Sequence, residues 1–468
     1  MEVIGITADS RAVRPGMVFA ALPGARADGR GFIAEAVARG AAAVLALEGT
    51  AWPAEAPARP LITNPDPRRA LALMAAAFFS AQPECVVAIT GTNGKTSSVD
   101  FLRQIWRDAG RKAASLGTLG LIAEGVPPGP SLTTPDPVAL HENLARLAHD
   151  GVAALAMEAS SHGIDQRRLD GVRLAAAGFT NLTRDHLDYH GSMAAYRVAK
   201  LRLFDTLLRA GAPAIAMADM NAETLAALRE IAARRGLDLR LVGAGGDALA
   251  LEAARPLAEG QELVFRIAGA RHEVLLPLPG RFQADNALLA VMCALATGVA
   301  EKAALTALGR LQGVRGRMER AAVLPNGAAI YVDYAHTPDA LTRLLIALRP
   351  HVVGRLHVLF GAGGDRDPGK RPLMGRAAAE AADRVWIPAD TPRSENPAAI
   401  RAAVMAGCPE AVDAGAREEA IAKAMGALGP GDVLAVAGKG HETGQEIGGI
   451  ILPFNDVAIV RKLAGRAP

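Results

Sequence analysis

The strongest chemical signal in the sequence is the glycine-rich run 90–96, Thr-Gly-Thr-Asn-Gly-Lys-Thr. It stands between an apolar run of strand type, 86–90, and a helical stretch, 97–109. Glycines let the backbone fold tightly, so that its N–H groups surround phosphate oxygens at the positive end of the helix dipole. Lys95 can then reach the β- and γ-phosphates of a nucleotide, and the Thr96 hydroxyl can bind Mg²⁺. The run predicts a site for ATP whose residues are Gly91, Thr92, Asn93, Gly94, Lys95, Thr96 and Ser97.

One departure narrows the class of nucleotide-binding protein. The usual phosphate loop has two fixed glycines, the second directly before the lysine and the first five positions earlier. In this sequence Gly94 is the second glycine, but the position of the first, residue 89, is Ile. The loop is therefore short at its start, which argues against a GTPase or a motor protein.

The elements that must position this loop follow from the alternation of apolar runs and helical patterns. Strand-type runs at 86–90, 152–157 and 175–180 alternate with helical patterns up to about Leu311, which is typical of a doubly wound α/β sheet. A second α/β pattern begins near Gly316, and its expected strands are 329–333, 355–360, 384–387 and 433–437. Before residue 85, strands at 18–22 and 43–47 enclose a helix at 32–39, and a Pro-rich loop at 52–60 precedes a helix at 68–79. We predict domains at 1–84, 85–315 and 316–468.

Composition excludes several classes of protein. Half of the 468 residues are hydrophobic and 21% are charged, which excludes a disordered chain. The 51 basic and 48 acidic residues and the 4% of aromatic residues argue against a nucleic-acid-binding surface. The cysteines are isolated in sequence, as expected of free thiols in a reducing compartment. With no secretory signal and no apolar stretch long enough for a bilayer, we expect a cytoplasmic enzyme that binds no membrane.

The loop 91–97 (GTNGKTS), with its missing first glycine, resembles the Mur ligase family of peptidoglycan precursor synthesis. Further matching strings are DSRAVRPGMVFAALPGARADG (9–29), SLTTPDP (131–137), MEASSHGIDQRR (157–168), NLTRDHLDYHG (181–191), VRGRME (314–319), VDYAHTPDAL (332–341), GAGGDRDPGKRPLMG (361–375) and GKGHETGQ (438–445). The resemblance implies a three-domain Mur ligase architecture with a central P-loop-type ATPase domain and a Rossmann-like C-terminal domain. The three domains would bind a uridine nucleotide, ATP and an incoming amino acid.

SSHG, DYAHTPDAL and GKGHE together resemble the members that add the third amino acid of the peptide. The implied enzyme is an ATP-dependent ligase that joins meso-2,6-diaminopimelate to UDP-N-acetylmuramoyl-L-alanyl-D-glutamate through an acyl phosphate. Two Mg²⁺ ions would accompany ATP, and we expect a monomer. No side-chain nucleophile is needed, because the protein only has to neutralise and align anionic reactants.

Residue type alone leaves the metal ligands open. Glu158 follows the expected strand 152–157, where α/β sheets hold ligands, but a surface Glu is common there. His186 would be an ordinary structural histidine, since Mg²⁺ prefers oxygen, and Lys200 an ordinary helix lysine. The resemblance assigns a Mg²⁺ ion to Glu158 and a second to His186, and it implies that Lys200 carries a carbamate that binds the metal. With Lys95 and Thr96 these residues form the implied catalytic and metal set.

The resemblance also assigns substrate contacts. The residues implied for the uridine nucleotide and its peptide are Ser10, Arg26, Ala27, Thr133, Thr134, Ser160, Gln166 and Arg168. The residues implied for ATP beyond the loop are Asn286, Arg317 and Asp333. We expect domain closure to complete the ATP site and exclude water from the acyl phosphate.

The implied amino-acid site decides between lysine and diaminopimelate, which differ by a distal carboxylate. Its residues are Arg366, Asp390, Thr391, Pro392, Arg393, Gly438 and Glu442. Arg393 can pair bidentately with that carboxylate, so we favour diaminopimelate. Thr391 departs from the Asp-Asn-Pro-Arg pattern of the members that use diaminopimelate, so one amide contact is missing or replaced.

Three alternatives remain. The enzyme could add lysine, or it could be a sister ligase that adds D-Ala-D-Ala or extends folylpolyglutamate; the pair DYAHTPDAL and GKGHE argues against a sister ligase. A nucleotide-binding regulatory protein without catalysis is disfavoured because Lys95, Thr96, Glu158, His186 and Lys200 are all present.

Overall fold

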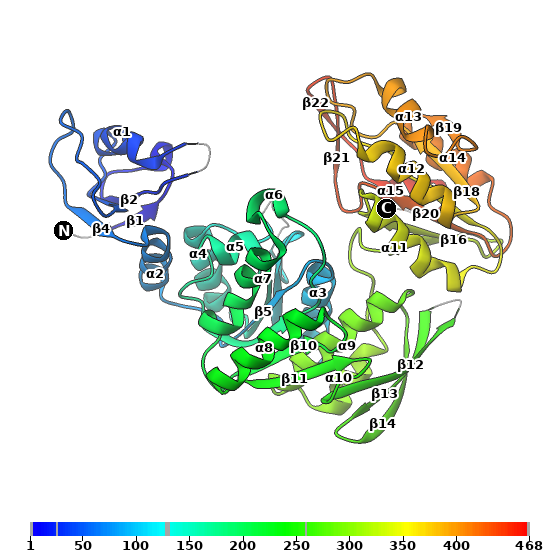
Figure 1. Ribbon diagram of the computed structural model, residues 1–468, viewed down its shortest axis with the longest axis horizontal. Coiled ribbons are helices and arrows are strands. Elements are labelled where there is room, and N and C mark those ends of the chain that lie inside the picture. Colours follow the sequence, from blue (N-terminus) through cyan, green and yellow to red (C-terminus); the bar gives the residue numbers. More distant parts are fainter. Residues whose placement is uncertain (1–2, 25–26, 127–131, 258–259, 466–468) are drawn as a thin grey trace. The chain divides into compact units, whose positions relative to one another are not determined.

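The computed structural model describes residues 3–24, 27–126, 132–257 and 260–465 (Figure 1). These residues form two compact units, one of 1–250 with 288–304 and one of 251–287 with 305–468. Strand β12 (Leu249–Leu257) and helices α9 (Arg281–Ala296) and α10 (Glu301–Leu308) run from one unit into the other. The predicted domain boundaries at 84/85 and 315/316 stay predictions.

The first unit begins with a four-stranded parallel sheet in the order β1-β2-β3-β4. Its elements are β1 (Gly5–Thr7), β2 (Met17–Ala21), β3 (Ala43–Leu47), β4 (Leu61–Asn64), α1 (Ile33–Ala38) and α2 (Pro67–Phe79). α1 packs its apolar residues with Phe19 in one core cluster, and Leu71 of α2 joins a second cluster with Leu45. The strand predicted at 43–47 is confirmed, and the stretch 52–60 has neither helix nor strand.

The strands of the larger sheet that lie wholly in the first unit have the order β11-β10-β9-β5-β8-β6-β7, and all these neighbours except β6 and β7 are parallel. Its strands are β5 (Cys85–Thr90), β6 (Ala113–Gly117), β7 (Gly120–Ile122), β8 (Ala154–Glu158), β9 (Leu174–Phe179), β10 (Pro213–Met217) and β11 (Asp238–Gly243). Its helices are α3 (Lys95–Asp108), α4 (Pro137–His149), α5 (Ser161–Asp165), α6 (Leu187–His190), α7 (Met193–Arg202) and α8 (Ala222–Arg235). The central strands are almost wholly buried, as expected of parallel strands covered on both faces. The predicted α/β sheet is therefore confirmed.

Two predicted boundaries at the carboxyl edge of this sheet are wrong by one or two residues. Helix α3 begins at Lys95 and not at residue 97, because Gly94 with a φ of 84° already turns the chain into the helix. Glu158 is the last residue of β8 and does not follow it, since pairing with β5 continues to Ile89 opposite Glu158. Both shifts place functional side chains directly on regular elements.

The second unit contains a hairpin that departs from the predicted α/β alternation. β13 (Gly260–Ile267) and β14 (Ala270–Leu276) pair antiparallel, and the side chains of β14 alternate in exposure. Alternating exposure is the pattern of a strand with one solvated face, and a two-stranded hairpin needs no crossover helix. The prediction of helix and strand alternation up to residue 311 is therefore wrong for this segment.

The main sheet of the second unit has the order β15-β16-β20-β17-β18-β19, parallel except for β15 and β16. Its strands are β15 (Glu319–Val323), β16 (Ala329–Asp333), β17 (Leu356–Leu359), β18 (Arg384–Pro388), β19 (Val412–Gly415) and β20 (Val433–Ala437). The helices are α11 (Pro338–Leu348), α12 (Lys370–Ala381), α13 (Pro397–Met405), α14 (Arg417–Gly426) and α15 (Asp456–Leu463), and β21 (Gly444–Ile447) with β22 (Ile450–Pro453) forms a small hairpin. A core cluster lies on each side of this sheet, so the predicted second α/β fold is confirmed.

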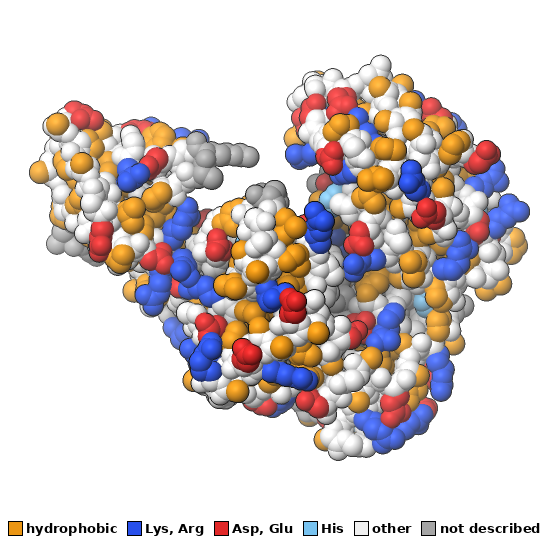
Figure 2. All heavy atoms as spheres, viewed as in Figure 1, with side chains coloured by type: hydrophobic (Ala, Val, Ile, Leu, Met, Phe, Trp, Pro, Cys, Tyr) orange, Lys and Arg blue, Asp and Glu red, His pale blue; other side chains and the backbone are white. Residues whose placement is uncertain are grey.

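Charged side chains of both signs are interspersed over the face drawn in Figure 2. In the described part of the chain, no helix is long and apolar enough to cross a membrane.

A buried ion pair joins two helices of the second unit. Arg417, the first residue of α14, donates from Nε and Nη2 to the carboxylate of Asp456, the first residue of α15, over 2.9 and 2.8 Å. Both side chains are fully buried. A guanidinium at a helix N-terminus opposes the helix dipole, and the carboxylate offsets that charge. Each ion therefore depends on the other.

We expect Arg417→Met to destabilise this unit by about 3–5 kcal/mol, because Asp456 would remain buried without its partner. Urea unfolding measures the effect. Arg343→Met is the matched control, since Arg343 forms an exposed pair with Asp339, and it should cost less than about 0.5 kcal/mol. The double variant Arg417→Met/Asp456→Leu should recover most of the loss. Equal stability of the Arg417 and Arg343 variants would contradict the assignment.

Candidate active site

The phosphate loop joins β5 to α3 in a conformation that requires glycine. Gly91 has a φ of 145°, and a Cβ atom there would lie 1.8 Å from Thr180 Oγ1. Gly94 has a φ of 84° and precedes Lys95, the first residue of α3. The strand, glycine turn and helix start that the sequence predicts are therefore present, and the binding of a phosphate there stays a prediction.

The segment after β9 holds the loop in place. Thr92 N donates to Asn181 O over 2.8 Å, and Asn93 N donates to Asn181 Oδ1 over 3.0 Å. Thr180 Oγ1 donates to Asn93 O over 2.6 Å. Neighbouring parallel strands carry both segments, so strand pairing brings the loop and the residues that bond to it together.

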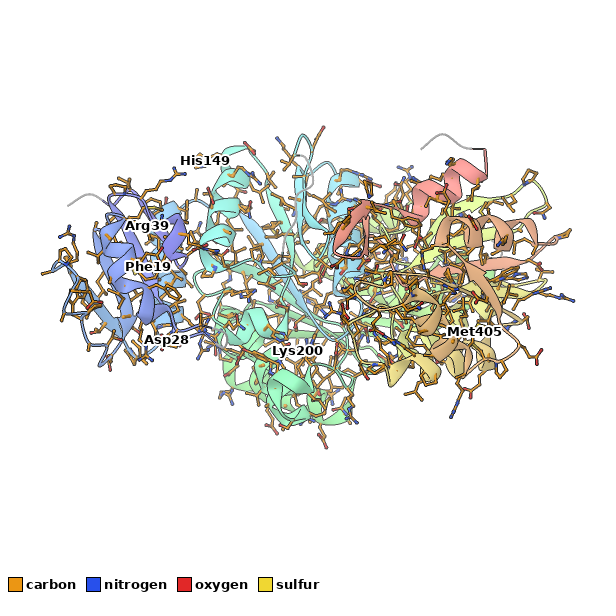
Figure 3. All side chains as sticks on the ribbon, turned by 90° about the horizontal axis from the view of Figure 1, so that it is seen from above. Phe19, Asp28, Arg39, His149, Lys200 and Met405 are labelled. Carbon is orange, nitrogen blue, oxygen red and sulfur yellow. The ribbon has the colours of Figure 1, made fainter. Side chains whose placement is uncertain are left out.

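Two lysine side chains converge on the loop. Lys95 Nζ donates to Gly91 O and to Thr92 O, both over 2.9 Å. Lys200 Nζ, on α7 (Figure 3), donates to the same Gly91 O over 2.7 Å. Lys200 is 1% exposed, and its burial, followed by the charge of Lys95, holds its pKa well below the usual range; Asp185 opposes that shift. Burial also raises the pKa of Tyr196, whose ring lies 4.6 Å from Lys200 Nζ, to about 12.

Glu158 is a buried carboxylate directly beside the loop. Its Oε1 accepts from Thr96 Oγ1 over 3.0 Å and from Thr118 N over 2.8 Å, and its Oε2 accepts from Thr118 Oγ1 over 3.2 Å. A Cβ atom on residue 117 would lie 2.2 Å from Oε1, so Gly117 is needed there. A hydroxyl and a carboxylate beside a phosphate loop are the oxygen donors that Mg²⁺ prefers.

These donors do not form a self-sufficient metal cage. Among the described residues, no three His, Cys, Asp or Glu side chains group as a ligand set. Mg²⁺ usually keeps waters and phosphate oxygens among its ligands, so Thr96 and Glu158 fit a nucleotide-bound ion.

The predicted peptide-substrate residues form one hydrogen-bonded network at the start of α5. Thr134 Oγ1 lies 2.9 Å from Glu158 O, to which it donates, and 3.0 Å from Ser160 Oγ, which caps α5 at Gly163 N. Arg168 donates to Thr134 O and to Gln166 Oε1, both over 2.7 Å. Thr133 joins through Thr118, 3.1 Å between hydroxyl oxygens. The structure therefore brings these five predicted residues together next to Glu158.

His186 lies in a cluster of rings and not on a carboxylate ligand set. Its side chain is 46% exposed, 3.5 Å from Asp185, and its ring centroid is 4.9 Å from that of His162. Its φ of 52° at the start of α6 is unusual for a non-glycine residue. Its predicted role as a metal ligand stays a prediction.

The residues predicted for the uridine nucleotide lie in the connections around β2. Ser10 is buried and donates to Glu35 Oε2 over 3.2 Å, and Ala27 is exposed. Arg26 lies outside the described residues. Their role in uridine binding stays a prediction.

Asp333, at the end of β16, is fixed by its own backbone surroundings. It accepts from Met318 N over 2.7 Å and from Ala335 N over 2.8 Å. Burial raises the pKa of its carboxyl group, although the charge of Arg317 opposes this. The Arg317 guanidinium lies 4.7 Å from the centroid of the Tyr334 ring, and Asn286 on α9 is 6% exposed. Asn286, Arg317 and Asp333 belong to the second unit, and their role in ATP binding stays a prediction.

The predicted amino-acid residues gather at the carboxyl edge of the main sheet of the second unit. Asp390 and Thr391 follow β18, Gly438 and Glu442 follow β20, and the exposed Arg366 follows β17, the strand between them. Glycines permit the close approach of these loops. A Cβ on residue 364 would lie 1.9 Å from the carbonyl oxygen of the buried Pro392, and one on residue 361 would lie 2.7 Å from Asp390 Cβ.

The Arg393 guanidinium is held by a backbone carbonyl and by a carboxylate side chain. Its Nη1 donates to Gly364 O over 2.6 Å, and its Nε lies 3.3 Å from Glu446 Oε2. The side chain is 25% exposed and the backbone φ is 51°. Arg393 is therefore a fixed cation with part of its surface open to a ligand.

The comparisons with known proteins decide the family. Three family models match: "Mur ligase family, catalytic domain" at 2–79, "Mur ligase middle domain" at 89–294 and "Mur ligase, glutamate ligase domain" at 316–440. The chain is 52% identical to the UDP-N-acetylmuramoyl-L-alanyl-D-glutamate--2,6-diaminopimelate ligase of Rhizobium meliloti, over 99% of the chain and 95% of the relative. The chain belongs to the Mur ligase family.

Solved structures agree with membership of the Mur ligase family. A structure of UDP-N-acetylmuramoyl-L-alanyl-D-glutamate--2,6-diaminopimelate ligase is 32% identical, with a TM-score of 0.74 over 99% of the chain and 95% of that structure. The MurF ligase of Thermotoga maritima in complex with ADP is 19% identical, with a TM-score of 0.63 over 98% and 96% of the two chains. At that identity the second likeness shows the shared fold alone.

Sequence reasoning missed three residues that contact the predicted site residues: Thr118 and Tyr196 in the first unit, and Lys439 in the second unit. Thr118 is 40 residues from the Glu158 carboxylate it binds, and no local pattern signals such a contact. Tyr196 is visible only as one residue in the string AYRVAK. Lys439 belongs to the string GKGHE, which comes directly after the apolar run 433–437. Its position just after an expected strand is the signal that could have identified it.

Gly91→Ala should lower the affinity for Mg-ATP roughly tenfold or more, because the new Cβ meets Thr180 in a backbone conformation that side chains rarely adopt. Isothermal titration with a non-hydrolysable ATP analogue measures the change. Gly110→Ala is the matched control: its φ of 82° is equally left-handed, yet no atom lies near the new Cβ. Equal affinities of the two variants would show that the loop geometry does not bind the nucleotide.

Proposed function

We propose that this chain catalyses the ATP-dependent addition of meso-2,6-diaminopimelate to UDP-N-acetylmuramoyl-L-alanyl-D-glutamate. The observation that carries the proposal is the 52% identity over almost the whole chain to a relative of that name. The geometry supports it independently, because a pre-formed phosphate loop adjoins a buried carboxylate and a polar network suited to an anionic peptide.

The proposed reaction begins when a carboxylate oxygen of the peptide attacks the γ-phosphorus of ATP. The bond from that phosphorus to the β-phosphate oxygen breaks, and ADP leaves an acyl phosphate. The amine of diaminopimelate then attacks the acyl carbon, loses a proton, and releases inorganic phosphate with the original carboxylate oxygen. In this scheme the backbone of residues 91–97 and Lys95 bind the phosphates, while Thr133, Thr134, Ser160, Gln166 and Arg168 orient the peptide.

Mg²⁺, when bound with ATP, would neutralise phosphate charge at the reaction centre. Thr96 and Glu158 are the residues proposed to hold it, and His186 and a modified Lys200 are proposed for a second ion. Glu158 is already oriented by three donors, so its carboxylate needs little rearrangement.

The environment of Lys200 supports the proposed carbamate. Carbon dioxide reacts with a neutral amine and not with an ammonium, and the lowered pKa of Lys200 increases the neutral fraction near pH 7. The modification would replace a cation beside Lys95 with an anion, which would relieve their repulsion. An oxygen ligand for Mg²⁺ would result where an ammonium would repel the metal.

We expect a carbamate signal in ¹³C NMR of the enzyme equilibrated with ¹³CO₂ near pH 8, and its absence in Lys200→Ala. The variant should lose activity by about a hundredfold or more, since it lacks the charged group at the reaction centre. Lys112→Ala is the matched control, because Lys112 is exposed and donates to Asp150 O over 2.7 Å. Full activity of the native enzyme in CO₂-depleted buffer, with a free Lys200 amine by mass, would contradict the proposal.

Selection of diaminopimelate over lysine is assigned to Arg393. Diaminopimelate carries a second carboxylate, and a partly exposed guanidinium at the pocket can bind it bidentately. Lysine has no group for that cation, so binding it would leave Arg393 without a ligand partner.

Phosphate release from ATP with the UDP-linked dipeptide and either amino acid tests the substrate assignment. Arg393→Ala should raise the KM for diaminopimelate by about tenfold or more and change the KM for ATP less than about twofold. Arg343→Ala changes an exposed arginine of the second unit and should leave the KM values for diaminopimelate and for ATP unchanged. If the native enzyme turns over lysine faster than diaminopimelate, the substrate assignment is wrong.

We also propose that the enzyme works as a monomer in the cytoplasm. The three cysteines are free thiols, which suits a reducing compartment. Charges of both signs are interspersed on the face of Figure 2, which argues against nucleic acid as a partner of that face.

A further inference from the structure

Lys439 is a fully buried lysine at the carboxyl edge of the second unit's main sheet. It follows β20, while Asp390 and Thr391 follow β18, and β17 separates these two parallel strands. A buried lysine costs free energy unless its ammonium is paired and hydrogen-bonded, so its partners explain its presence.

Three acceptors surround the Lys439 ammonium. Its Nζ lies 3.1 Å from Thr391 Oγ1, 3.3 Å from Glu442 Oε2 and 3.4 Å from Asp390 Oδ1. An ammonium has three N–H donors and no acceptor, so these contacts use its full capacity. Lys439 therefore fixes two acids and a hydroxyl around one point.

The contacts belong to a chain of charges that alternate in sign from the core to the pocket. Asp456 pairs with Arg417, whose Nη1 lies 3.7 Å from Asp390 Oδ2, and Lys439 links the other oxygen of Asp390 to Glu442. The side chains of Asp456, Arg417 and Lys439 are fully buried, that of Asp390 is 11% exposed, and that of Glu442 is 43% exposed. Asp390 already faces a cation on each oxygen. Glu442 is therefore the acid with the capacity to take a ligand ammonium.

Thr391 is the position at which this chain departs from the Asp-Asn-Pro-Arg pattern. Its hydroxyl donates to Asp390 Oδ1 over 3.2 Å and accepts from Lys439. The single O–H donor is thus used inside the protein, and none remains for a ligand carboxylate. The side chain at 391 completes the bridge between β18 and β20 and leaves the distal carboxylate to Arg393.

We propose that Lys439 is a positioning residue of the amino-acid pocket, which through Asp390 and the Thr391 hydroxyl sets the direction of Glu442 toward the ammonium of the incoming amino acid. The inference rests on the proposed function, since it takes diaminopimelate as the ligand of this pocket. It goes beyond that function in assigning an internal role to Thr391 and an indirect role to Lys439.

Steady-state kinetics with diaminopimelate and ATP as separate variable substrates test the proposal. Lys439→Met should raise the KM for diaminopimelate by about tenfold or more, with the KM for ATP within about twofold. Thr391→Val should raise the same KM by roughly threefold to tenfold, and Thr391→Ser, which keeps the hydroxyl, should behave as the native enzyme. Because Thr391 is proposed to act through its contact with Lys439, the double variant Lys439→Met/Thr391→Val should be no worse than Lys439→Met alone.

The controls separate this proposal from the function on which it rests. Lys462→Met, a change at an exposed lysine paired with Glu418, should leave every constant unchanged. If the native enzyme does not use diaminopimelate, the proposed function fails. If it does, and Thr391→Val equals Thr391→Ser while Lys439→Met folds with an unchanged KM for diaminopimelate, the positioning role is overturned. Equal increases in both KM values would indicate a general structural role and would also overturn it; should Lys439→Met fail to fold, the Thr391 pair decides.

Discussion

The site residues of both units depend on one constraint, the meeting of parallel strand ends at a single sheet edge. In the first unit β5 and β8 are neighbours, so the phosphate loop and Glu158 emerge side by side. In the second unit β17, β18 and β20 bring the loops of Asp390, Gly438 and Arg366 to one edge. Backbone pairing, and not the side chains themselves, places the polar groups within hydrogen-bond distance.

The same constraint brings several charged and polar groups close together at the sheet edge. Glycines provide the space for these groups, and cations balance the negative charges. Gly117 leaves room for Glu158, and Gly364 leaves room for the carbonyl of Pro392. Each buried charge is then next to a charge of opposite sign, as in the series of ion pairs from Asp456 through Arg417 and Asp390 to Lys439. A few placed cations thus serve anionic ligands in a chain whose net charge is only +3.

Much of the fold was predictable because its signals are local. The strands at 43–47, 329–333 and 433–437 occur at the predicted residues, since each is a short apolar run bounded by turn residues. The phosphate loop is likewise contiguous in sequence. The hairpin β13–β14 escaped prediction because its alternating pattern is weak and broken, and helix α3 began early because glycine geometry decides a boundary that composition does not.

Contacts between distant segments could not be predicted from the residues alone. Thr118 binds Glu158 across 40 positions, and Lys439 reaches Thr391 across 48. Nothing in a single sequence records which strand lies beside which, and the order β20-β17-β18 is what creates the second contact. The departure at Thr391 was visible in the sequence, but its physical meaning emerged only with the position of Lys439.

Amide-bond formation by this Mur ligase is proposed to proceed through phosphoryl transfer to a carboxylate. Oxygen-isotope transfer tests it most directly: the reacting carboxylate of the UDP-linked dipeptide is labelled with ¹⁸O, and the inorganic phosphate is analysed by mass after turnover with diaminopimelate. We expect one ¹⁸O atom in each phosphate released. Unlabelled phosphate, or label in an adenine nucleotide, would contradict it.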